Sequence, residues 1–222
     1  MLNKSSFLVE REHESHILKG NAAYLPKATF RVTVVKNIGK ETAKLMTADN
    51  GIIELEEGTL IGLNELILAN QSEIEIRSEL GFVFRLGQYA EFSLELTVLG
   101  ISPILYGNIW KGYLSGNTQP IVMCAKYRTS CYIPCASSFY TEAIDGNHDA
   151  FYVLSDNFII WEFDERGKQF PIVTAEEGQK VILEFDNDRP MRERYTVTSV
   201  EEISNKEYDY ITESFLNPKE WR

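Results

Sequence analysis

Aspartate and glutamate are absent from the stretch between Leu96 and Thr141, although the chain has 33 acidic residues among its 222. An even distribution would place about seven acidic residues in this window. The window instead holds the sparse cations Lys111, Lys126 and Arg128, five of the eleven tyrosines and all three cysteines. Such a change in composition marks a segment that is either buried or bound.

Long apolar runs and clustered basic residues are missing as well. The longest apolar patches are short, such as Phe158–Trp161, and fall far below the ~20 residues that cross a bilayer. The formal net charge is −11, which argues against general binding to the nucleic-acid backbone, because such binding needs clustered Lys and Arg. The same charge argues against an anionic membrane surface. It leaves a basic protein partner open.

Cysteine is rare, and the first residues carry charges where a secretory signal would be apolar. Residues 1–16 contain only a short apolar stretch, which is followed at once by charged residues. Three cysteines, an odd number, without an export signal indicate free thiols in a reducing compartment. We therefore expect a cytoplasmic protein, or one incorporated into an assembly made in the cytoplasm.

What the sequence does contain is alternation of apolar and polar residues, the pattern of half-buried strands. Residues 28–34 alternate, and Glu91–Val98 has the strongest strand pattern of the chain. In this second segment the even-numbered apolar residues are expected to face a core, and Ser93 and the other odd-numbered residues are expected to face water. One-sided strands of this kind are typical of antiparallel sheets.

Turn sequences separate the strand candidates. Asp49–Gly51 lies between residues 43–48 and 52–55, and its Asn-Gly pair tolerates the positive φ of a hairpin turn. Further turns rich in Asp, Asn, Gly and Pro fall at residues 164–167 and 186–190. So many short strands and turns predict a mainly β chain, folded as an antiparallel sandwich or barrel-like sheets.

A short C-terminal helix is predicted by the capping box Ser204–Glu207. Tyr208, Ile211 and Phe215 then fall on one helical face, and Asn217-Pro218 ends the helix. The sequence leaves open whether this helix docks on its own chain or on a neighbouring one.

The chain is long enough for one large β domain or two small ones. The strongest strand ends just before Gly and Pro residues at 100–103, so we predict an N-terminal β module, residues 1–100, and a C-terminal β module with the terminal helix, residues 101–222. A single compact domain is the alternative. The short echo between Glu56–Gly58 and Glu176–Gly178 is weak evidence for duplication.

The cysteines are the first candidates for chemistry. Their spacing lacks the paired C-x2-C pattern of structural zinc sites, so a metal would need help from His148. A cysteine-dependent hydrolase would use Cys131 or Cys135 as nucleophile and His148 as base, with Asp145 or Asp149 orienting the histidine. Free cysteines packed as small apolar residues, and a solvated turn around His148, are the commoner roles. The three cysteines are Cys124, Cys131 and Cys135.

Other catalytic patterns are incomplete. His13–His16 is one residue short of the H-E-x-x-H helix of zinc proteases, and a hydrated charged turn fits it better. No nucleotide-binding loop and no nucleophile elbow occur in the sequence. We therefore expect a non-enzymatic protein and predict no catalytic residues, no metal ligands and no cofactor.

Aromatic residues of the acid-free window remain as candidates for a site. The centres of protein interfaces are enriched in aromatic residues and Arg and depleted in acidic residues. The alternative is that residues 121–127 form a buried central strand, because buried strands lose charged residues for desolvation reasons alone. The predicted partner-binding residues are Trp110, Tyr113, Tyr127, Arg128 and Tyr132.

The sequence thus favours a non-catalytic protein that contacts a protein partner, or a copy of itself, through the acid-free surface around residues 104–140. An assembly component fits this description, including a structural protein of a viral or phage-like particle. An acidic inhibitor or immunity-type protein that neutralises a basic enzyme is one alternative. The cysteine-dependent hydrolase is the second alternative.

Overall fold

The computed structural model describes residues 30–37, 40–78, 83–97, 100–106, 111–115, 121–125, 129–133, 138–163, 168–186, 188–190 and 193–216. For residues 30–37, 111–115, 121–125 and 129–133 only the backbone is described. The expected helix stop at Asn217-Pro218 and the pair His13 and His16 lie outside these residues.

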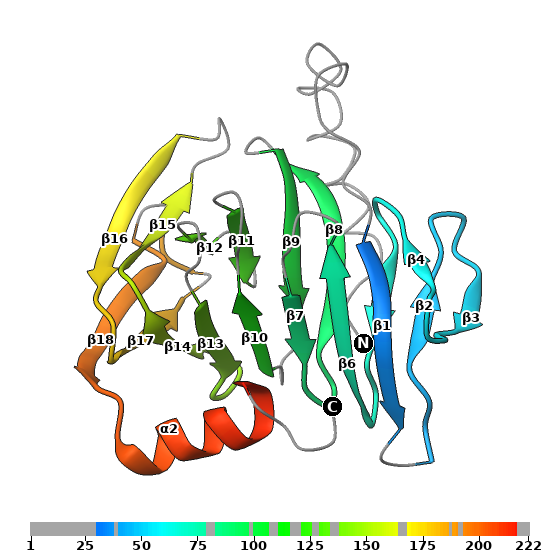
Figure 1. Cartoon of the computed structure of the whole chain (residues 1–222). Coiled ribbons are helices and arrows are strands. Elements are labelled where there is room, and N and C mark those ends of the chain that lie inside the picture. The colour runs from blue at the N-terminus through cyan, green and yellow to red at the C-terminus, as the bar shows by residue number, and fades with distance from the viewer. Residues whose placement is uncertain are drawn as a thin grey trace.

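The described strands form two nine-stranded sheets that pack face to face as a sandwich (Figure 1). All neighbouring strands are antiparallel except β9 and β11, which are parallel. The predicted mainly β antiparallel sandwich is therefore confirmed.

Sheet A contains, in spatial order, β18 (Tyr195–Glu202), β17 (Gln179–Phe185), β14 (His148–Ser155), β13 (Ser138–Ala143), β10 (Lys111–Ser115), β7 (Val83–Leu86), β6 (Ser72–Ser78), β1 (Phe30–Asn37) and β4 (Leu60–Ile61). Sheet B contains β16 (Gln169–Ala175), β15 (Phe158–Phe163), β12 (Thr129–Ile133), β11 (Ile121–Ala125), β9 (Gly100–Tyr106), β8 (Glu91–Thr97), β5 (Leu66–Leu68), β2 (Lys44–Met46) and β3 (Ile52–Glu54).

The chain passes repeatedly from one sheet to the other. The pair β6–β7 lies in sheet A, β8–β9 in sheet B, the single strand β10 in sheet A, β11–β12 in sheet B, β13–β14 in sheet A, β15–β16 in sheet B and β17–β18 in sheet A. The strands that flank a hairpin pair with each other in the opposite sheet, as β7 does with β10 and β14 does with β17. In both sheets, later strands therefore lie mostly towards the end formed by β16 and β18, and both sheets contain strands from before and after position 100. The division into modules 1–100 and 101–222 stays a prediction.

The main hydrophobic core lies between the sheets. Sheet A contributes the fully buried Ile74 and Phe151, and sheet B contributes Phe92 and Ile160 from β8 and β15. Apolar side chains of both sheets belong to one cluster that extends from Ala43 to Tyr195 in the sequence. Burial of this continuous apolar surface is the main stabilising contribution to the sandwich.

Strand β8 differs from its sequence-based prediction in one respect. Phe92 and Leu94 are buried, as the alternation predicts, but Ser93 is also fully buried. The expectation that Ser93 faces water is therefore wrong. β8 is an interior strand of sheet B, between β5 and β9, and both of its faces are covered at this position. A periodicity argument identifies the apolar face but does not show what covers the other one.

The described turns at residues 49–51, 56–58 and 176–178 follow the predicted chemistry, whereas the predicted turn at residues 164–167 lies outside the described residues. In the β2–β3 hairpin Asn50 takes the positive φ, 67°, and the Thr47 N–H donates to the Gly51 carbonyl. The two echoed segments form the same tight turn: Gly58 and Gly178 have φ of 84° and 86°, a backbone conformation that favours glycine. Each turn carries the chain from a hairpin of sheet B to the next strand of sheet A. The echo thus corresponds to a repeated local structure.

The predicted C-terminal helix is present as α2 (Asn205–Ile211), followed by one π-helical segment, η2 (Thr212–Leu216). Both hydrogen bonds of the capping box at Ser204 and Glu207 are formed. Ile211 and Phe215 are buried, whereas Tyr208 is 46% exposed. The residues predicted to share one helical face thus differ in burial; Tyr208 and Ile211 both lie in α2, and Phe215 lies in η2. No helix in the described part of the chain is long and apolar enough to cross a membrane.

Candidate functional site

The predicted aromatic site is only partly described. Trp110, Tyr127 and Arg128 lie outside the described residues. Tyr113 belongs to β10 in sheet A and Tyr132 belongs to β12 in sheet B, so the backbone positions of these two residues are in different sheets. A common binding surface formed by all five residues stays a prediction.

The described strands of the acid-free window lie in the interior of the two sheets. β9, β10, β11, β12 and β13 are all interior strands with a hydrogen-bonded neighbour on each side. Interior strands covered on both faces rarely carry unpaired carboxylates, because desolvation of the charge is unfavourable. The central-strand alternative for residues 121–127 is therefore favoured for the described segment 121–125 at the level of backbone position.

The structure brings together polar residues that the sequence analysis did not identify. A line of residues in cross-strand register crosses sheet A beneath the C-terminal helix, and we call it the tyrosine row. Tyr113 occupies a central position in this line by its register with Arg85 and Tyr140. The tyrosine row consists of Glu75, Arg85, Tyr113, Tyr140, Tyr152, Lys180 and Glu201.

Two tyrosines of the row share one carboxylate. The hydroxyl of Tyr140 donates to Glu142 Oε2 at 2.9 Å, and the hydroxyl of Tyr152 donates to Glu142 Oε1 at 3.0 Å. Their rings lie 5.3 Å apart, centroid to centroid. Burial, and after it the charge of Glu142, raises the pKa of both Tyr140 and Tyr152. Both phenols therefore remain protonated donors at neutral pH.

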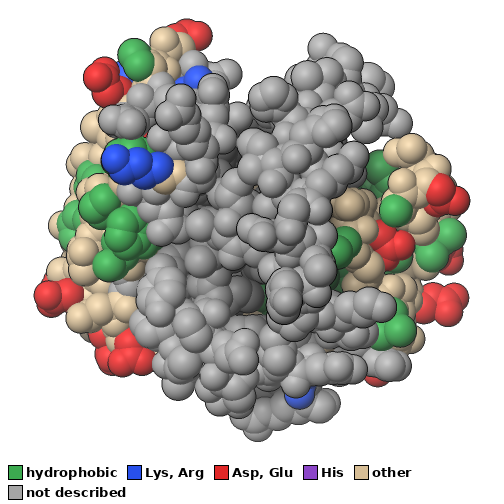
Figure 2. All heavy atoms as spheres, turned by 90° about the horizontal axis from the view of Figure 1, so that it is seen from above, with side chains coloured by type: hydrophobic (Ala, Val, Ile, Leu, Met, Phe, Trp, Pro, Cys, Tyr) green, Lys and Arg blue, Asp and Glu red, His purple; other side chains and the backbone are tan. Residues whose placement is uncertain are grey.

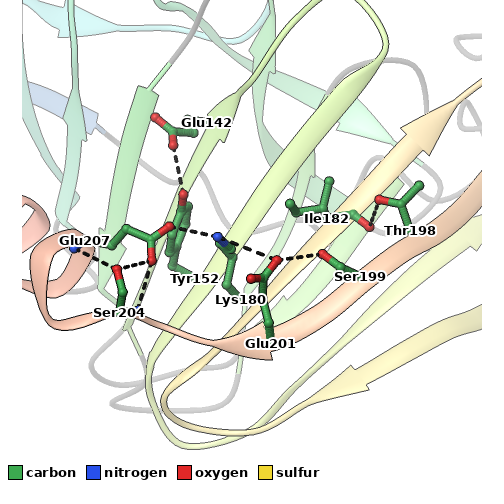
Figure 3. Close-up of polar contacts among 9 residues, drawn as sticks. All are labelled: Glu142, Tyr152, Lys180, Ile182, Thr198, Ser199, Glu201, Ser204 and Glu207. Carbon is green, nitrogen blue, oxygen red and sulfur yellow. Dashed lines mark hydrogen bonds and ion pairs between the residues drawn. The ribbon is translucent and has the colours of Figure 1, made fainter.

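Lys180 and Glu207 connect the row to the helix (Figure 3). Lys180 Nζ lies 2.8 Å from Glu207 Oε1 and 3.7 Å from Glu201 Oε1. Burial alone would lower the pKa of Lys180, but the hydrogen bond and charge of Glu207 outweigh it and raise the pKa. Burial likewise opposes ionisation of Glu207, but hydrogen bonds from Lys180 and Ser204 lower its pKa. The pair stabilises docking above the unfolded-state pKa of Glu207 and below that of Lys180.

The other end of the row holds a buried ion pair. Glu75 is 1% exposed and accepts hydrogen bonds from Arg77 Nε and Arg85 Nε, each at 2.7 Å. Arg85 also donates through Nη1 to the backbone carbonyl of Phe215 in η2. Arg85 thus links two strands of sheet A with the C-terminal segment.

The C-terminal segment packs against the row through apolar contacts. The ring of Phe215 lies 4.9 Å from that of Tyr140, and Ile211 and Phe215 belong to a second hydrophobic cluster with Ala150 and Tyr152. Figure 1 places α2 beside β13 and β14, on the face of sheet A opposite the main core. Among the row residues whose side chains are described, Arg85 and Lys180 bond both to a carboxylate and to the C-terminal segment or its helix. This arrangement is typical of a structural network that orients a docked element.

An alkaline loss of stability is expected from the two buried phenols. In the folded state both have a raised pKa, so the unfolded chain releases its phenolic protons first and stability falls as the pH rises above about 10. Tyr140→Phe should make this fall shallower. Urea unfolding at a series of pH values measures how the free energy of unfolding depends on pH, and tyrosinate absorbance follows the ionisation of the phenols. Tyr208→Phe, which removes an exposed hydroxyl, is the control, and an unchanged slope in Tyr140→Phe would contradict the expectation.

His148 and Cys131 of the enzymatic alternative belong to different sheets. His148 Nδ1 lies 2.9 Å from Asp145 Oδ2, so Asp145 does orient the imidazole, whereas Asp149 is buried on the opposite face of β14. Cys131 belongs to β12 in sheet B, and Cys135 lies outside the described residues. His148 shares the outer face of sheet A with Ala150, which points away from sheet B. Among the described residues no group of three potential ligands is placed to hold a metal.

An exposed apolar edge lies at the far end of the sandwich from the helix. Sheet B ends at β3 and sheet A at β4, with no further described strand beyond them. Large apolar side chains at this end are half exposed: Ile52 59%, Ile53 50%, Leu60 50% and Leu63 40%. We call these four residues the isoleucine edge. Figure 2 shows hydrophobic and acidic side chains together at the right-hand end, where Figure 1 places β2, β3 and β4.

Sequence reasoning did not single out the isoleucine edge, because exposure depends on which strand ends a sheet. The only local signal is the continuous apolar pair Ile52-Ile53 directly after a hairpin turn. Comparison with protein-family models, with curated proteins and with solved structures finds no significant match for this chain.

Proposed function

We propose that this chain is a non-catalytic protein-binding component that contributes to an assembly. The observation that carries the proposal is the isoleucine edge. Several large apolar side chains exposed at the end of a sheet favour protein contact, because they are otherwise an aggregation hazard. Ile52 and Ile53 are adjacent on β3, and Leu60 and Leu63 follow after one tight turn.

The tyrosine row supports the same proposal by its chemistry. Described carboxylates and cations in and beside the row are hydrogen-bonded or paired, as Glu142 is with Tyr140 and Lys180 is with Glu207. A general acid or base needs access to a substrate atom, whereas Glu75 is 1% exposed and Lys180 is 13% exposed. We assign the row a structural role and the edge the binding role.

The proposal is tested by affinity purification of the tagged full chain from its natural host, with mass spectrometry of what copurifies. Ile52→Lys combined with Ile53→Lys places two charges on the edge and should reduce recovery of a specific partner by at least about tenfold. Val200→Lys is the matched control, since Val200 is 45% exposed on the edge strand β18 at the other end. Thermal unfolding shows whether each variant is folded.

Equal recovery of the same partners with the wild type, the double variant and Val200→Lys would contradict an edge-based function. The proposed contact through Trp110, Tyr127 and Arg128 is tested in the same assay. Tyr127→Ala with Arg128→Ala should lower partner recovery if the acid-free window adds to the interface.

An acidic inhibitor is the alternative with a specific observation behind it, namely the net charge of −11. Such a protein would bind a basic enzyme through carboxylates, and its affinity would fall steeply as salt is added. Binding through apolar side chains of the isoleucine edge would be weakened far less by salt. Measuring the captured complex at low and high ionic strength separates the two classes.

A further inference from the structure

The hydrogen-bond pattern of the β2–β3 hairpin shows which backbone groups of β3 point outward. The Thr47 N–H donates to Gly51 at 2.9 Å, and the Leu55 N–H donates to Ala43 at 3.0 Å. Bonded and non-bonded pairs alternate in an antiparallel ladder. Ile53 therefore bonds to its partner in β2, and the N–H and C=O groups of Ile52 and Glu54 face away from that strand. No other described strand pairs with this side of β3.

The edge strands at the opposite end of the sandwich carry residues that disfavour pairing with another strand. There, β16 carries Pro171 and β18 ends in Glu201 and Glu202, all of them exposed. Proline and charge on an edge strand discourage pairing with another chain. The strand β3 has no proline; two of its three residues are exposed isoleucines, and the third, Glu54, is an exposed acidic residue that disfavours pairing with another acidic chain. Its short length limits any pairing to a short segment.

The surroundings of β3 are acidic. Between residues 40 and 65 the chain has six acidic residues and two lysines. Asp49, Glu54, Glu56 and Glu57 are exposed beside the edge, and hydrogen bonds from Thr47 and then from the Gly51 backbone lower the pKa of Asp49. Two copies joined by their β3 strands would place these like charges together, which is unfavourable. The charge instead complements a basic segment.

We propose that the β3 edge docks an extended, basic segment of another protein, which adds to sheet B as one further strand. The outward N–H and C=O groups of Ile52 and Glu54 supply the main-chain bonds, the two isoleucines supply apolar contact, and the acidic surroundings select Lys or Arg. This inference rests on the proposed protein-binding function and specifies the chemistry of the partner.

Short synthetic peptides test the inference directly by fluorescence anisotropy with the full chain. The probe is a labelled peptide in which lysine and valine alternate over five residues, and its counterpart has glutamate in place of lysine. A third peptide keeps lysine but is N-methylated at alternate amides, which removes strand hydrogen bonds. The lysine peptide is expected to bind at least about tenfold more tightly than either of the others.

A substitution at Ile52 separates strand addition from general attraction to an acidic surface. Ile52→Pro removes an outward N–H while leaving the bonds between β2 and β3 in place, since proline is tolerated on an edge strand. It should weaken binding of the lysine peptide by at least about tenfold. Val200→Lys is the control and should bind the peptide like the wild type. Circular dichroism shows that each variant keeps its strands.

Three outcomes would overturn the inference. The first is binding of the lysine peptide that Ile52→Pro leaves unchanged, because attraction would then be purely electrostatic. The second is equal binding of the N-methylated peptide. The third is absence of binding together with dimerisation through Ile52 in sedimentation, which would make the occupant a second copy. If all peptides fail but partner recovery still depends on Ile52 and Ile53, strand addition is wrong and the protein-binding function stands.

Discussion

Phe215→Ala is expected to lower the free energy of unfolding by about 3 kcal/mol, the lower end of the range for truncating a buried aromatic side chain. Phe215 is 5% exposed and stacks on Tyr140 within the second hydrophobic cluster. The truncation leaves a cavity between η2 and sheet A. It also loosens the segment whose carbonyl accepts from Arg85. Urea denaturation followed by circular dichroism measures the change.

Tyr208→Ala is the matched control for this prediction, because Tyr208 lies in the adjoining α2 and is 46% exposed. Its unfolding free energy should differ from that of the wild type by no more than about 0.5 kcal/mol. Hydrogen exchange adds a local measurement: amides of residues 205–216 should lose protection in Phe215→Ala and keep it in the control. Equal losses in the two variants would show that the helix contributes little to stability.

Glu75→Ala is expected to lower the free energy of unfolding by about 3–5 kcal/mol, the typical effect of breaking a buried ion pair. Glu75 is 1% exposed and accepts from both Arg77 and Arg85. The side chain of Arg85 is 14% exposed and would lose its carboxylate partner in a largely desolvated place. Because Arg85 also donates to Phe215, the loss should extend to the C-terminal segment.

Arg77→Ala is the control for the ion pair. Its side chain is 56% exposed, so removing it should cost no more than about 1 kcal/mol, as for other exposed pairs. Glu75→Gln keeps the shape of the side chain and should fall between the two variants. If Glu75→Ala costs no more than Arg77→Ala, the carboxylate is not a stabilising element of sheet A.

The fold class and most turns could be predicted because they are encoded locally. Alternation marks β8, the Asn50-Gly51 pair marks the β2–β3 hairpin, and the capping box at Ser204 marks the start of α2. Each of these signals depends on residues within a few positions of one another. The structure contains all three predicted elements.

The tyrosine row could not be predicted because it depends on the register of several strands, including β7 with β10 and β14 with β17, which are not consecutive in the sequence. Glu142 is the first acidic residue after the acid-free window, yet only the pairing of β13 with β14 shows that it accepts from Tyr140 and Tyr152. Lys180 meets Glu207 through the position of a helix that the sequence alone does not dock. A single residue of register slip would move each side chain to the other face.

The repeated passage of the chain from one sheet to the other has a consequence for folding. Many pairs join consecutive strands, and among the described register partners Phe30 and Ser78 are the most distant in sequence. Short-range pairing lowers the entropy lost in closing each loop, which favours rapid folding for a protein made of strands. The sandwich can be extended hairpin by hairpin as synthesis proceeds. The last described segment, α2 with η2, would then dock on strands of sheet A that are already in place.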